Sequence, residues 1–221
     1  MGGRIIRMPE GDEPKLMYPR VGTIHVGMKN EKGFPQSVDY FIPKGRYASL
    51  FTQAYGDKPD SIQIVFPSDD PALVCNEYYE YRDIQGSRFA YGDGMNFMVW
   101  DKNHYAEFCI EQYPDIMTRI SDLFPKKERG WKVQLTMNFI IPKIRGIAGC
   151  WTFRTSGNLS SIPQIRTSFD TVLQNNGFVK NVLFDLNVTF AKSQKPNDPS
   201  RFPVVSLIPN ESEENIKRIK G

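Results

Sequence analysis

Residues 132–141 read KVQLTMNFII, and this stretch decides how the second half of the chain folds. Apolar side chains recur at every second position along it, which is the period of a strand with one buried face. A loop and a strand over 150–154 follow, and a strand over 182–190 alternates most strictly of all. Between these two strands, apolar residues at helical spacing predict a helix over 161–176.

Capping signals bound this helix on both sides. Ser161 is a typical N-cap residue, and Pro163 suits the first turn, where a missing N–H costs nothing. Asn176 and Gly177 favour the left-handed conformation that ends many helices. The second half therefore predicts the order strand, loop, strand, helix, strand.

The first half repeats this order. Alternation predicts strands over 22–29 and 38–42, an apolar stripe predicts a helix over 47–55, and a strand follows over 61–66. We therefore expect an α+β fold with mixed, mostly antiparallel sheets, two helices and two similar β-β-α-β lobes. The repetition fits either an internal duplication or the chance recurrence of a common local arrangement.

The remaining segments complete the predicted organisation. The expected parts are a flexible N-terminal arm over 1–17, a first lobe over 18–100, an irregular or helical connector over 101–130, a second lobe over 131–209 and a charged tail over 210–221. The first lobe includes an extra hairpin that turns at Gln85 and Gly86, and the connector includes a short helix from Pro114.

Composition limits the classes of function. The chain has 221 residues, 40% of them hydrophobic, which is enough for a sizeable core. Its formal net charge of +3 comes from mixed positive and negative residues, which argues against a strong nonspecific grip on DNA. Three scattered cysteines fit a reducing compartment, and no stretch resembles a signal peptide or a membrane span. We expect a cytoplasmic protein that does not enter membranes.

Few residues suggest catalysis. The histidines are His25 and His104, and a nucleophilic Cys/His pair of Cys109 with His104 competes with the simpler reading of a surface histidine and a buried thiol. A metal set of His104, Cys109, Asp101 and Glu107 matches no standard zinc spacing. We expect no catalytic residue, no bound metal and no cofactor.

The run over 76–83, NEYYEYRD, is the most unusual segment. On a strand, Tyr79 and Tyr81 would share one face, where they suit a recognition patch because tyrosine combines contact area with a polar group. Cross-strand packing is the alternative for both tyrosines. The nearby Gly92-Asp93-Gly94 predicts a hairpin turn rather than a phosphate loop.

Basic residues gather loosely around two loops. Such loops could hold phosphates or simply remain solvated. The candidate residues for binding a partner or nucleic acid are Lys29, Lys32, Lys44 and Arg46 in the first half, and Lys143, Arg145 and Arg154 in the second.

Two blocks of sequence resemble a known family. The first comprises YPRVGTIHVG over 18–27, VDYF over 38–41 and AYG over 54–56; the second comprises LTMNFIIP over 135–142 and GCWTFRTSG over 149–157. Both are similar to the recombination directionality factors of phages that use large serine integrases. With the helix and strand after each block, the resemblance covers most of the chain from 18 to 208.

The resemblance implies a function and a partner. Such factors are not enzymes; they bind a serine integrase while it sits on attachment-site DNA, and they change which sites pair so that excision replaces integration. Members of the family carry a cysteine-rich, zinc-like insert between the two blocks. The corresponding segment 101–130 has one histidine, His104, and one cysteine, Cys109. This difference argues against a structural metal, and the resemblance says nothing of the oligomeric state.

Two other functions remain open at this stage. A nucleic-acid-binding accessory protein of a phage or mobile element, for example for single-stranded DNA, would use sheet aromatics and loop cations, and its binding would weaken steeply with salt. A hydrolase would show a deep pocket with convergent titratable groups.

Overall fold

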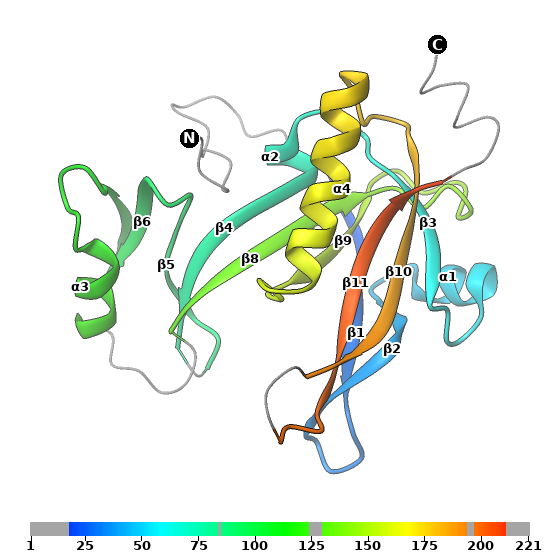
Figure 1. The fold of residues 1–221 in the computed structure, drawn as a ribbon, viewed down its shortest axis with the longest axis horizontal. Helices are drawn as coiled ribbons and strands as arrows, with labels where there is room; N and C mark the ends of the chain where they lie inside the picture. Colours follow the sequence, from blue (N-terminus) through cyan, green and yellow to red (C-terminus); the bar gives the residue numbers. More distant parts are fainter. Residues whose placement is uncertain (1–17, 84, 124–129, 194–196, 211–221) are drawn as a thin grey trace. The chain divides into compact units, whose positions relative to one another are not determined.

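A computed structural model describes residues 18–83, 85–123, 130–193 and 197–210 (Figure 1). The chain divides into two compact units. The described residues of unit 1 fall within 76–135, and those of unit 2 within 18–75 and 136–210. The strands pair mostly antiparallel and are joined by short helices, so the predicted α+β class is confirmed.

Unit 2 contains one sheet in which distant parts of the sequence pair. The strand order is β2-β1-β9-β8, where the strands are β1 (Arg20–Lys29), β2 (Pro35–Lys44), β8 (Gly130–Phe139, whose first part lies in unit 1) and β9 (Cys150–Thr155). β1 runs antiparallel to β2 and parallel to β9. Gly22 permits this packing, because a Cβ there would overlap the ring of Trp151.

A second sheet of unit 2 carries much of the core. Its order is β11-β10-β3, with β3 (Ser61–Val65), β10 (Leu183–Lys192) and β11 (Arg201–Pro209) all antiparallel. Helix α4 (Ser161–Asn176) packs against β11, and the Ser161 hydroxyl accepts a hydrogen bond from Val205 N–H at 3.0 Å. The ring of Phe66 meets those of Phe169 and Phe184 edge-on, at 5.0 and 5.4 Å between centroids.

Two short helices complete unit 2. Helix α1 (Ala48–Tyr55) follows β2 and ends at Gly56, which has a positive φ of 83°. Helix α2 (Pro71–Val74) begins where the Asp70 carboxylate accepts a hydrogen bond from Ala72 N–H at 2.9 Å. Within the described ranges, no helix combines the length and the apolar composition needed to cross a bilayer.

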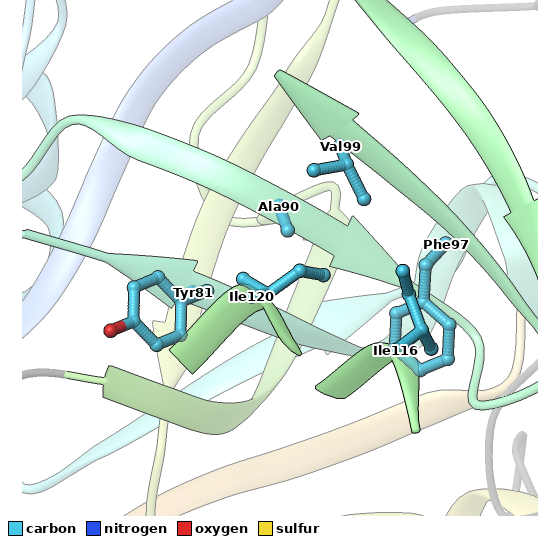
Figure 2. Close-up of a cluster of buried hydrophobic side chains, with 6 residues drawn as sticks. All are labelled: Tyr81, Ala90, Phe97, Val99, Ile116 and Ile120. Atoms are coloured by element: carbon cyan, nitrogen blue, oxygen red, sulfur yellow. The ribbon is translucent and has the colours of Figure 1, made fainter. Parts of the chain in front are cut away.

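Unit 1 is a sheet covered on one face by a helix. The order is β8-β4-β5-β6-β7, with β4 (Cys75–Arg82), β5 (Arg88–Gly92), β6 (Asn96–Asp101) and β7 (His104–Cys109). Helix α3 (Ile116–Leu123) inserts Ile116 and Ile120 among side chains of the sheet (Figure 2). The core cluster consists of Tyr81, Ala90, Phe97, Val99, Ile116 and Ile120.

The structure differs from the sequence prediction at several elements. Helix α2 and strand β7 were not predicted, whereas α1, α3 and α4 lie where the sequence predicts two main helices and a short helix in the connector. Ser161 is the first helical residue rather than the N-cap, which is Ser160, whereas Gly177 ends α4 in the left-handed conformation as expected. The predicted arm over 1–17 and the tail beyond residue 210 lie outside the described residues, and the division into two similar lobes stays a prediction.

Candidate functional site

The sheet of unit 1 has a second face, opposite α3, which we call the outer face. Strand register determines its members, because side chains of paired residues lie on the same side of a sheet. One cross-strand row is Glu80, Tyr91, Met98 and Glu107. Two further pairs lie beside this row, Arg82 with Arg88 and Trp100 with Tyr105. These eight residues define the outer face. The register shifts after Tyr81, so Phe89 turns toward the core and both arginines stay outside.

Aromatic rings and one arginine hold each other in place on the outer face. The Arg88 guanidinium lies 4.0 Å from the ring centroid of Tyr91 and 5.7 Å from that of Tyr105. The Tyr105 hydroxyl donates to the Arg88 carbonyl oxygen at 2.8 Å, and the Tyr105 ring meets Tyr91 and Trp100 edge-on at 5.3 and 5.2 Å. The half-buried rings thus form an ordered, partly exposed surface.

The two carboxylates of the outer face have different surroundings. Glu80 is only 5% exposed and accepts two hydrogen bonds from the Arg82 guanidinium, at 2.8 and 3.1 Å. The hydrogen bond from Arg82 to Glu80 also raises the pKa of Arg82. Glu107 is exposed, and within the described residues its side chain makes no ion pair or hydrogen bond.

The predicted contact residues Tyr79 and Tyr81 lie on the inner face. Tyr81 is 2% exposed, and its ring meets Trp131 edge-on at 5.4 Å; burial raises its pKa. Tyr79 is half-buried, 6.4 Å from the ring of Phe97. The core encloses the Tyr81 ring, which favours the cross-strand packing alternative for this residue, and the recognition role of the two tyrosines stays a prediction.

Sequence reasoning missed the residues that do form the exposed aromatic surface. Arg88, Tyr91, Trp100 and Tyr105 lie on three strands, one of which was not predicted. Alternating rings near 91 and 100 were an available signal. That signal could not reveal which alternate set of side chains on each strand α3 covers.

The basic residues of the first half fall into two separate groups. Lys29 pairs with Pro35 next to the turn of the β1–β2 hairpin, and Lys44 pairs with Thr23 toward the other end. These pairs are six residue steps apart along β1, or about 20 Å. Lys32 belongs to the turn, and Arg46 follows β2, so the hairpin does not unite the four cations.

The basic residues of the second half also lie in unit 2. The Lys143 ammonium is 4.6 Å from the ring centroid of Tyr55, at the end of α1. Arg145 is exposed in the loop between β8 and β9, and Arg154 is exposed near the end of β9. Arg46 lies 5.5 Å over the ring of Tyr47. Two of these candidate cations thus rest on tyrosine rings of their own unit.

The candidate catalytic and metal-binding residues do not converge. His104 and Cys109 occupy opposite ends of β7, about 16 Å apart along an extended strand, and so cannot form a nucleophilic pair. Among the described residues, no three His, Cys, Asp or Glu side chains gather as a metal site would require. His25 lies 2.8 Å from the Thr23 hydroxyl, and burial, with a smaller effect of Lys44, lowers its pKa.

Comparison with known proteins gives a family. Residues 21–210 match the family described as Gp3-like, recombination directionality factor-like. The matched span includes every strand and helix of both units except the first residue of β1. Neither a curated protein nor a solved structure matches the chain.

Proposed function

The chain belongs to the Gp3-like, recombination directionality factor-like family, and on that premise we propose that it is a non-enzymatic regulator that binds a large serine integrase at its attachment sites and switches recombination from integration to excision. The family match over residues 21–210 carries the proposal, because it covers the whole described architecture rather than one motif. In this proposal the protein reaches attachment-site DNA through the integrase.

The outer face of unit 1 supports a role in protein binding. Tyrosine, tryptophan and arginine are the residues most enriched in the energetic centres of protein interfaces. Tyr91, Trp100 and Tyr105 are already held by ring contacts and by Arg88, so little side-chain entropy is lost when a partner covers them.

Direct nucleic-acid binding fits the observations less well. Stacking rings on a sheet could take bases, but residues 76–135 carry ten acidic and eight basic residues, and a net negative unit repels phosphate. The basic residues of the β1–β2 hairpin lie at opposite ends of it rather than along one stripe. The charge distribution therefore favours a protein partner.

A recombination assay tests the proposal. The purified protein is titrated into the large serine integrase of the same genetic element, with either the original or the hybrid pair of attachment sites on supercoiled DNA. We expect recombination of the hybrid pair to appear and that of the original pair to fall as the protein approaches the integrase concentration. An unrelated serine integrase is the control and should not respond.

Two outcomes would count against the proposal. Unchanged recombination of both site pairs over a broad concentration range would contradict the regulator. Tight binding of the protein alone to oligonucleotides, weakening steeply as salt rises, would instead favour the nucleic-acid-binding accessory protein.

A further inference from the structure

We infer that the outer face of unit 1 is the surface that binds the integrase, and that it receives a basic patch of that protein bearing arginine or lysine side chains. The inference rests on the proposed function and deepens it by naming a site and the chemistry of its partner. Three observations carry it: the rings of the outer face, the surroundings of its carboxylates, and the charge of unit 1.

The rings of the outer face are suited to cations. Arg88 shows how a guanidinium sits here, since it lies over Tyr91 at 4.0 Å. Trp100 offers the aromatic ring that attracts cations most strongly, and no cation of the described residues lies over it. Its neighbour Tyr105 meets it edge-on at 5.2 Å. A cation from a partner would therefore find a partly exposed aromatic surface that is already ordered.

A carboxylate lies beside these rings. Glu107 is two residues after Tyr105 in β7, so both side chains lie on the outer face, about 7 Å apart along the strand. Glu80, in the same cross-strand row, is already bound by Arg82. Glu107 makes no such contact within the described residues. It is thus the acidic group of this face that a basic partner would neutralise.

Net charge separates the possible occupants of this face. A partner rich in phosphate would meet Glu107 and the excess of acidic residues over 76–135, which disfavours it. Unit 2 carries seventeen basic and twelve acidic residues over 17–75 and 136–221. Because unit 2 is net positive, a second copy of the chain is the main competing occupant of this face. We commit to the integrase, and the experiment separates all three.

A charge reversal with a matched control tests the inference. Glu107→Lys reverses the charge on the outer face, and Glu111→Lys makes the same change at an exposed residue in the turn after β7. Both sites are exposed, so the folded structure should survive, which thermal melting checks. Affinity for the purified integrase is measured by biolayer interferometry. We expect Glu107→Lys to weaken binding at least tenfold, Glu107→Gln to weaken it less, and Glu111→Lys to change it less than twofold.

Each other outcome has a definite meaning. If the wild-type protein does not bind the integrase, the proposed function fails. If it binds and Glu107→Lys behaves like Glu111→Lys, the proposed function stands and the site assignment is overturned. A phosphate-rich partner would be bound more tightly by Glu107→Lys, so tighter binding to attachment-site duplex alone would overturn the choice of partner. If light scattering shows a dimer of the wild-type protein that Glu107→Lys abolishes, while integrase binding is unchanged, the outer face would be assigned to a second copy of the chain.

Discussion

The inner and outer faces of the unit 1 sheet are built from the same strands and are both rich in aromatic side chains. The inner face presents Tyr81 and Phe97 to α3, which buries them almost completely. The outer face presents Tyr91, Trp100 and Tyr105 beside arginines and carboxylates, and these rings stay partly exposed. Aromatic content therefore does not distinguish the core from the proposed contact surface in this unit; the cover of α3 and the neighbouring charges do.

The largest expected effect is the loss of an inner-face ring. Phe97 is fully buried, with ring contacts to Tyr79 and Trp131, so Phe97→Ala leaves a cavity and should lower the free energy of unfolding by about 3–5 kcal/mol. Urea denaturation measures it. Phe97→Leu, the matched control, should cost roughly 1–2 kcal/mol because most of the volume is kept. A loss below about 1 kcal/mol for Phe97→Ala would show that this face is not the core of the unit.

The corresponding outer-face substitution should separate stability from binding. Trp100→Ala should lower the free energy of unfolding by only about 1 kcal/mol, because Trp100 is half-buried, yet weaken integrase binding by about 2 kcal/mol. Trp100→Phe keeps an aromatic ring and should retain most of the affinity. Equal affinities of wild type and Trp100→Ala, with both folded, would remove the functional difference between the two faces.

The regular elements could be predicted because their signals are local. Alternation over 182–190 anticipates β10, and Gly177, with its φ of 77°, ends α4 where a left-handed residue was expected. The parallel pairing of β1 with β9 joins residues more than a hundred positions apart, for which no local pattern exists. Strand β7 follows a turn at Lys102, which has a positive φ, and its sequence HYAEFC does not alternate between apolar and polar side chains, so the strand period is missing there.

The proposed contact surface was only half predictable. The run over 76–83 correctly separates into two faces, with Tyr79 and Tyr81 on one and Glu80 and Arg82 on the other. Which face is exposed depends on α3, whose approach to β4 is a tertiary event. The sequence therefore separates the two sides of this strand, and only the structure shows that Tyr81 lies on the buried one.

Cysteine reactivity compares buried and partly exposed positions at single residues. Cys109 is half-buried and shares a cross-strand row with Asn96 on the outer side, whereas Cys75 and Cys150 are buried, and burial raises the pKa of Cys150 to about 11. A thiol reagent at neutral pH should modify Cys109 first and the other two only after denaturation. Peptide mass spectrometry measures the order, and bound integrase should slow the modification of Cys109. Faster modification of Cys150 would contradict this assignment.

The smallest effect is expected from His25 in unit 2. Its folded-state pKa lies below the ordinary 6.5, so the unfolded chain binds the proton more readily. The resulting stability is present above pH 6.5 and is lost as pH falls through the lower folded pKa. His25→Gln should therefore lose less stability than wild type between about pH 7 and pH 5, as measured by urea midpoints. Integrase affinity at neutral pH should not change, and a large change would implicate unit 2 in the contact.

Site-specific photo-crosslinking tests the central claim most directly. A benzophenone amino acid replaces Tyr105 on the outer face in one sample, and in another it replaces Phe34, which is 64% exposed at the β1–β2 turn of unit 2. Both samples are irradiated with the integrase on paired hybrid attachment sites. The account predicts a covalent adduct with the integrase from position 105 and little from position 34. An adduct from position 34 alone would contradict it.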